Sequence, residues 1–114
     1  MSRSDAISPA QVRDAAPLFA ALGDETRLRL LARLSAGAPL SITRLSTRSL
    51  VTRQAVTKHL EVLSEAGLVQ SSKQGRERLW QLEPKRLEEA HAHLDRISRQ
   101  WDEALDRLKA FVER

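Results

Sequence analysis

Apolar side chains recur every three or four positions between residues 53 and 66, at Val56, Leu60 and Leu63. This spacing places them on one face of a helix, because an α-helix completes a turn in about 3.6 residues. The opposite face and the first turn carry Arg53, Gln54, Thr57 and Lys58. Such side chains suit base edges and phosphates, whereas a face that meets only solvent normally carries Glu/Lys pairs. The pattern predicts a helix with one buried face and one face able to contact a nucleic acid.

Both ends of this helix are marked by residues with known conformational preferences. Thr52 is the expected N-cap, since a threonine oxygen accepts a hydrogen bond from an unpaired backbone N–H. Gly67 is the expected stop, because glycine tolerates the left-handed conformation beyond a helix end. A shorter helix over residues 41–47 precedes it across a turn at residues 48–51, and its expected buried residues are Ile42 and Leu45. Together the two helices predict a helix-turn-helix.

The chain before residue 40 has a polar start followed by two helical segments. Residues 1–13 are polar and small, and we expect them to form a flexible tail. A brief apolar helix then ends at Gly23, and Asp24 caps a clearer helix. The residues expected inside that second helix are Leu28, Leu31 and Leu34.

Two short β-like segments follow Gly67. They cover residues 68–73 and 77–82 and flank Gly75, which suits the tip of a tight turn. A hairpin placed directly after a helix-turn-helix is a wing. Basic residues of this hairpin are Lys73, Arg76 and Arg78.

Pro84 opens a long helix that is expected to reach about Val112. Its apolar positions step by three or four residues, close to a heptad repeat. About 28 residues of helix span ~42 Å, which is longer than a core of this size covers. The apolar seam either lies across the chain's own domain or pairs with a second copy. We expect the second copy, because an uncovered seam of this size exceeds the apolar patch that a monomer tolerates. The expected dimer contacts are Phe19, Leu87, Leu94, Ile97, Trp101, Leu105 and Leu108.

These elements predict a mainly α fold with a small β-hairpin, a winged helix-turn-helix with a long C-terminal dimerisation helix. The expected division is a tail at residues 1–13, a DNA-binding domain at residues 14–83 and a dimerisation helix at residues 84–114.

The positive charge is concentrated in the middle of the chain. Residues 41–80 hold seven Lys/Arg and three Asp/Glu, and so account for the whole net charge of +4. A basic centre between neutral flanks is the electrostatic pattern of a module that binds a polyanion.

Composition excludes several other classes of protein. The 114 residues include no cysteine, which removes disulfides, thiolate metal sites and cysteine nucleophiles. The sequence has no run of 18 apolar residues that could span a membrane, and its N-terminus has no apolar signal core. We therefore expect a cytoplasmic protein. No catalytic motif is present, and we expect no enzyme and no cofactor.

Several motifs together resemble the ArsR-like winged helix-turn-helix repressors of bacteria. The segment F-A-A-L-G-D-E-T-R-L-R-L-L-A-R-L is similar to the family's opening, T-R-Q-A-V-T-K-H-L-E-V-L-S-E-A-G-L-V to its recognition helix, and Q-G-R-E-R-L-W-Q-L to its wing. The resemblance covers the chain from about Phe19 to its end. It implies an autoregulatory, operator-binding homodimer that pairs through its terminal helices.

The chain departs from the family pattern at two places. The helix-turn-helix turn of the family usually has a glycine where this chain has Ser49. Metal sensors of the family carry a Cys-x-Cys pair in the third helix, where this chain has Ile42-Thr43-Arg44-Leu45. The resemblance therefore implies a member that does not sense metals through thiolates.

The three histidines do not form an obvious metal site. His91 and His93 lie two residues apart, so they point ~200° away from each other on a helix. Relatives with zinc between their terminal helices have a second ligand pair about eleven residues on, where this chain has Ala104 and Arg107. We expect no metal, and we expect His59 to pack or to contact phosphate. Whether His91 and His93 bind a metal across a dimer stays open.

We therefore predict a sequence-specific transcriptional regulator, an autoregulatory repressor that binds an inverted-repeat operator as a homodimer. A metal-responsive repressor with nitrogen and oxygen ligands, or a protein-interaction module that uses the long helix, are the alternatives. The expected partners are double-stranded DNA, a second copy and a small-molecule effector of unknown identity, and no membrane. The expected DNA contacts are Thr43 and Arg44 before the turn, Thr52 at the start of the recognition helix, Arg53, Gln54, Thr57 and Lys58 in the major groove, and Lys73, Arg76 and Arg78 from the wing.

Overall fold

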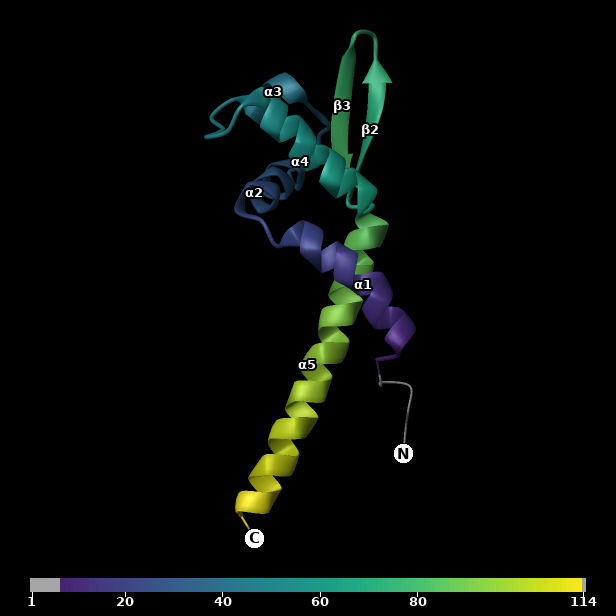
Figure 1. Ribbon diagram of the computed structural model, residues 1–114, viewed down its shortest axis with the longest axis vertical. Helices are drawn as coiled ribbons and strands as arrows, with labels where there is room; N and C mark the ends of the chain where they lie inside the picture. Colours follow the sequence, from purple (N-terminus) through teal and green to yellow (C-terminus); the bar gives the residue numbers. More distant parts are fainter. Residues whose placement is uncertain (1–6, 114) are drawn as a thin grey trace.

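A computed structural model describes residues 7–113 of the chain. Figure 1 shows a helical body, with a β-hairpin and a long helix that extend from it in opposite directions. The elements are α1 (Pro9–Leu22), α2 (Glu25–Leu34), β1 (Leu40–Ser41), α3 (Ile42–Ser46), α4 (Arg53–Glu65), β2 (Val69–Gln74), β3 (Glu77–Leu82) and α5 (Pro84–Val112). The predicted mainly α fold with a hairpin and a long last helix is confirmed. Among residues 7–113, none of the helices combines the length and the hydrophobicity that a membrane span requires.

Side-chain oxygens cap the helices of the body. The carboxylate of Asp24 accepts from the backbone N–H of Arg27 at 3.0 Å, and the hydroxyl of Thr52 accepts from that of Ala55 at 3.1 Å. Ser41 caps α3 in the same way. Each cap satisfies a backbone donor that the helix itself leaves unpaired. The predicted caps Asp24 and Thr52, and the predicted stop at Gly67 with φ +79°, are confirmed.

Helix α1 begins earlier than the sequence suggested. Ser8 and Gln11 form a capping box, in which each side chain accepts from the other residue's backbone N–H, and the helix then continues through Pro17. Its buried residues are Ala15, Leu18 and Ala21. The expected flexible tail is therefore wrong for residues 9–13, and residues 1–6 lie outside the described part of the chain. The rest of the expected division stays a prediction.

One apolar core joins all four helices of the body to the sheet and to the start of α5. The predicted buried face of α4 is confirmed, since Val56, Leu60 and Leu63 are fully buried. In α2 the expectation for Leu28 is wrong, because its side chain is 51% exposed and Leu30 is buried instead. Six residues turn a helix by ~240°, so Leu28 cannot share the core-facing side with Leu34.

The sheet has three antiparallel strands in the order β1-β3-β2. The predicted hairpin is confirmed, with Gly75 at its tip in the left-handed conformation. Strand β1 was not predicted, because two residues are too short to show an alternation. It pairs Leu40 with Trp80 and leads directly into the Ser41 cap of α3, so it ties the hairpin to the helix-turn-helix.

Helix α5 divides into an inner part that packs on the body and an outer part that does not. Ala90 is buried, Leu87 packs against the core, and the ring of His93 lies 5.6 Å from that of Phe19 on α1. Beyond these residues the helix leaves the body and stretches the molecule to 67 × 26 × 22 Å. The exposed large apolar residues of this outer part are Leu94, Trp101, Leu105, Leu108, Phe111 and Val112.

Candidate nucleic-acid interface

The turn between α3 and α4 is held from both sides. Arg33 of α2 donates from one guanidinium nitrogen to the carbonyls of Leu45 and Thr47, at 3.0 and 3.2 Å. Within the turn, the hydroxyl of Ser49 accepts from the backbone N–H of Val51 at 3.2 Å. These bonds fix the direction in which the chain enters Thr52 and therefore the start of α4.

The left-handed residue of this turn is Arg48, with φ +65°, and not Ser49. A side chain with a Cβ is strained in this conformation, since the Cβ approaches the following carbonyl. The family pattern led us to expect the glycine-like position of the turn at residue 49. The structure places the conformation that favours glycine one residue earlier, at Arg48, so this expectation is wrong.

The exposed face of α4 presents three long polar side chains. Arg53, Gln54 and Lys58 are exposed, and none of them makes a side-chain hydrogen bond or ion pair with another residue of the described range 7–113. Since the apolar face behind them is fully buried, they point away from the protein. They are free to bind an external polyanion.

The two threonines expected at this face are already engaged. Thr52 uses its hydroxyl oxygen as the N-cap, and Thr57 donates its hydroxyl to the carbonyl of Arg53 at 3.1 Å. The Thr57 oxygen keeps its capacity to accept, so it can receive a hydrogen bond from a base amino group but has no proton left to donate.

The wing brings its cations together. Lys73 lies directly opposite Arg78 in the hairpin, and Arg76 follows the glycine at the tip. Like charges in a cross-strand pair destabilise the sheet. Within residues 7–113, the Arg78 guanidinium has a partner in the Ser71 hydroxyl at 2.8 Å, whereas the Lys73 ammonium has none. A bound phosphate would offset that repulsion.

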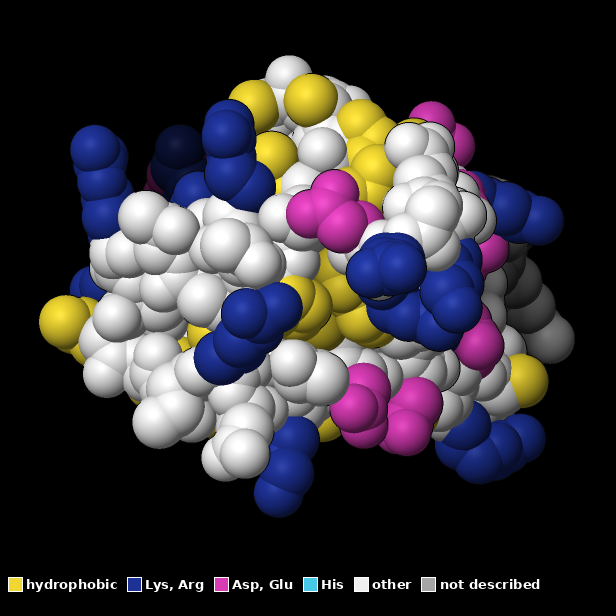
Figure 2. Space-filling model, turned by 90° about the horizontal axis from the view of Figure 1, so that it is seen from above, with side chains coloured by type: hydrophobic (Ala, Val, Ile, Leu, Met, Phe, Trp, Pro, Cys, Tyr) yellow, Lys and Arg dark blue, Asp and Glu magenta, His cyan; other side chains and the backbone are white. Residues whose placement is uncertain are grey.

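Thr43 and Arg44 stand on the exposed side of α3. The Thr43 carbonyl accepts from the hydroxyl of Thr47 at 2.9 Å. Figure 2 shows the molecule from the hairpin end, where Lys and Arg side chains project at several places around the face with apolar side chains between them. The predicted DNA contacts thus lie on α3, α4 and the hairpin, and their contact with DNA stays a prediction.

His59 lies behind this face and contacts protein. Its Nδ1 is 3.2 Å from the Arg27 guanidinium and 3.8 Å from the Asp24 carboxylate. Arg27 in turn donates to the carbonyl of Ala21 at the end of α1, at 2.6 Å. The backbone N–H of Arg27 lowers the pKa of Asp24 below its ordinary value. This cluster joins α1, α2 and α4, and it supports the packing interpretation of His59.

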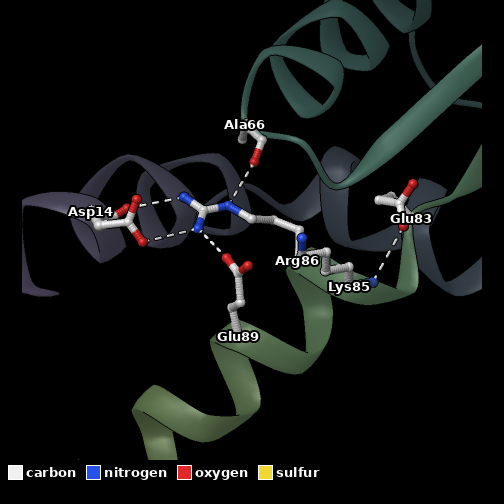
Figure 3. A network of polar contacts seen from close by, with 6 residues as sticks. All are labelled: Asp14, Ala66, Glu83, Lys85, Arg86 and Glu89. Carbon is white, nitrogen blue, oxygen red and sulfur yellow. Dashed lines mark hydrogen bonds and ion pairs between the residues drawn. The ribbon is translucent and has the colours of Figure 1, made fainter.

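Arg86 joins three helices through one guanidinium group (Figure 3). Its Nε donates to the carbonyl of Ala66 at the end of α4 at 3.1 Å, and its Nη2 to the carbonyl of Asp14 on α1 at 3.0 Å. Its Nη1 contacts the carboxylates of Glu89 and Asp14, which raise the pKa of Arg86. Arg86 is not among the residues predicted from the sequence, because an arginine in the first turn of a helix carries no signal of partners 20 and 72 residues away.

The histidines of α5 have separate partners. His91 lies 3.5 Å from Asp95, and His93 contacts Phe19. Across residues 7–113, no group of three or more His, Cys, Asp or Glu side chains is placed to hold a metal ion.

Known proteins share this architecture and sequence. A family model described as a helix-turn-helix domain matches residues 22–71. The chain is 40% identical over 85 residues to the HTH-type transcriptional regulator Rv2034 of Mycobacterium tuberculosis, covering 75% of this chain and 76% of the relative. It is 43% identical over 68 residues to the HTH-type transcriptional regulator YuzN of Bacillus subtilis, covering 54% of this chain and 74% of the relative.

A solved structure is similar over almost the whole chain. This is an ArsR-like transcriptional regulator from Rhodococcus sp. RHA1, at 39% identity and a TM-score of 0.82, with 93% of this chain and 96% of that chain covered. The chain belongs to the ArsR family of DNA-binding, winged helix-turn-helix transcriptional regulators.

Proposed function

We propose that this protein is a sequence-specific repressor that binds an inverted-repeat operator in its own promoter as a homodimer. The observation that carries the proposal is the exposed face of α4, where Arg53, Gln54 and Lys58 project without partners in residues 7–113 from a helix whose other face is fully buried. A helix of this kind fits the major groove, with its first turns nearest to the base edges.

Each side chain has a distinct role in this proposal. Gln54 is uncharged and forms paired hydrogen bonds to adenine, so it reads sequence. Arg53 and Lys58 contact phosphate or guanine. Lys73, Arg76 and Arg78 of the wing, together with Thr43 and Arg44 of α3, contact the backbone and supply affinity with little specificity.

Homodimerisation is proposed from the outer part of α5. Trp101, Leu105 and Leu108 are each more than half exposed and lie on one side of the helix. A second copy of α5 would cover this seam, and two recognition helices would then read two half-sites. Phe19 and Leu87 contribute less to this interface than expected, since both pack on their own chain's core.

The proposal is tested by replacing Gln54 with alanine and measuring affinity for an operator selected from random DNA and for unselected DNA. We expect a loss of about 1–3 kcal/mol per half-site on the operator and almost none on unselected DNA. The affected base pairs should be symmetric, with half-site centres ~10–10.5 bp apart or a multiple of that distance.

A matched control is Gln70→Ala, since Gln70 is an exposed glutamine on β2 and is not among the proposed DNA contacts. This variant should bind both DNAs as the wild type does. If Gln54→Ala left the ratio of operator to unselected affinity unchanged, α4 would not read sequence and the proposal would fail.

A further inference from the structure

A groove of about 920 Å³ lies between α2 and the turn that joins α3 to α4. Its floor is apolar, formed by the buried side chains of Leu30 and Leu45. One wall is formed by Val51 and by Leu50, whose side chain is 90% exposed. Pockets for small molecules usually hold about 300–1,000 Å³ and combine an apolar lining with a few polar groups. The groove has the size and the lining of such a pocket.

The groove is strongly basic. Four arginines line it, against one acid, Glu25, which is already paired with Arg29 at 2.9 Å. Arg33 is occupied by the carbonyls of Leu45 and Thr47. The side chains of Arg44 and Arg48 have no hydrogen-bonding or ion-pairing partner among the residues that the structure describes. Two unpaired guanidinium groups therefore stand beside an apolar floor.

We propose that this groove binds a small organic carboxylate with an apolar body, an effector of the repressor. The body lies on Leu30, Leu50 and Val51, and the carboxylate is held by Arg44 and Arg48. Charge complementarity selects an anion, because a guanidinium fork matches a carboxylate and is not satisfied by a neutral ligand. The limited volume selects a small molecule over a folded partner.

Binding here would oppose binding to DNA, and this part of the inference rests on the proposed function. Arg48 and Leu50 belong to the turn that leads into Thr52, the cap of α4. Arg44 is also a proposed phosphate contact, so an anion held by Arg44 competes with the DNA backbone. By linkage, DNA must then weaken binding of the carboxylate by the same factor.

The site is tested without DNA by titrating the full chain with 2-naphthoate and following backbone amide shifts by ¹⁵N–¹H NMR. We expect saturable shifts at residues 25–33 and 44–51. The neutral isostere 2-naphthamide should bind at least tenfold more weakly, and acetate, which lacks the apolar body, should cause no saturable shift. Leu50→Asp and the double variant Arg44→Gln/Arg48→Gln should each weaken 2-naphthoate binding at least tenfold.

Leu28→Asp is the matched control, because Leu28 is an exposed leucine on α2 that does not line the groove. It should bind 2-naphthoate as the wild type does. The proposed site would be overturned if 2-naphthamide bound as tightly as 2-naphthoate, or if Leu28→Asp and Leu50→Asp weakened binding equally. It would also be overturned if the shifts were confined to residues 94–112 of α5, or if millimolar 2-naphthoate caused no shift.

The coupling to DNA is tested separately. Saturating 2-naphthoate should weaken operator binding by the wild type several-fold and leave that of Leu50→Asp unchanged. An unchanged operator affinity of the wild type would overturn the effector role. Since the NMR titration contains no DNA, its result stands whether or not the chain proves to be a sequence-specific repressor.

Discussion

At the scale of single residues, the strain at Arg48 is the clearest departure from an unstrained backbone. Arg48 is the only non-glycine residue with a positive φ in the described range of the chain. The left-handed conformation costs roughly 1–2 kcal/mol for a residue with a Cβ, while glycine loses about 0.5–1 kcal/mol more conformational entropy on folding. We therefore expect Arg48→Gly to raise the free energy of unfolding by about 0.5–1 kcal/mol.

Urea denaturation checks this expectation, with Ser49→Gly as the control. Ser49 has no positive φ, and its hydroxyl accepts from the N–H of Val51, so glycine there should lower stability. Equal effects of the two substitutions would show that the left-handed conformation is not the source of the difference.

Asp24 makes the stability of the fold depend on pH in the acid range. The N–H of Arg27 lowers the pKa of Asp24 in the folded state, so the ionised carboxylate stabilises the fold above its unfolded pKa of about 3.9. This contribution is lost as the pH falls below about 4 and the folded carboxyl takes up its proton. Asp24→Asn keeps a cap that does not titrate, so its unfolding free energy should change less between pH 6 and pH 3 than that of the wild type. Urea denaturation measures this difference. If both proteins lost the same unfolding free energy between pH 6 and pH 3, the loss would come from other carboxylates.

At the scale of elements, long periodic segments of the sequence predicted their helices and strands correctly. Very short elements, and contacts between residues far apart in the sequence, were not predicted. Helix α4, α5 and the hairpin were visible because their periods and end signals lie within the segment itself. Ser8 and Pro9 were a local signal for a short helical turn, but not for a helix that continues without a break through Pro17. Strand β1 had no period to detect. The exposed face of α4 followed from its own buried face, whereas the Arg27 and Arg86 clusters depend on which helices meet in three dimensions.

Arg86 connects the recognition helix to the frame formed by α1 and α5. Its side chain is 19% exposed, and removing it leaves the Ala66 carbonyl and two carboxylates without their donor. Arg86→Met should lower the free energy of unfolding by about 1–3 kcal/mol. Arg86→Lys should recover only part of this loss. A single ammonium cannot reach the Ala66 carbonyl at the end of α4 and, at the same time, both the carbonyl and the carboxylate of Asp14.

Lys85→Met is the matched control for Arg86, since Lys85 is its exposed neighbour and its side chain makes no hydrogen bond or ion pair with another residue of the range 7–113. Chemical denaturation should give wild-type stability for this variant. An Arg86→Met protein as stable as Lys85→Met would show that the three-helix link contributes nothing measurable.

At the scale of the whole molecule, the proposed DNA-binding surface and the apolar seam of α5 lie apart. The wing, α3 and α4 carry the cations proposed to contact DNA, while α5 extends in the opposite direction (Figure 1) and carries the exposed apolar seam. A single chain buries its core without the outer part of α5, since the last α5 residues in the core are Leu87 and Ala90. Its length is explained if it positions a second copy, because the distance between two α4 helices must match the spacing of two half-sites.

Trp101 is the residue on which this explanation depends most. It is 67% exposed in the single chain, so Trp101→Asp should leave the body folded. In a dimer the same carboxylate would be buried without a partner, which costs several kcal/mol. Sedimentation at micromolar concentration should therefore show monomers.

Gln100→Asp is the matched control, because it adds the same charge at the neighbouring exposed position. It should leave assembly unchanged if the seam alone forms the contact. The monomeric variant should bind a single half-site as the wild type does, and lose the extra affinity for two. A dimer that persists in Trp101→Asp would place the interface elsewhere on the chain.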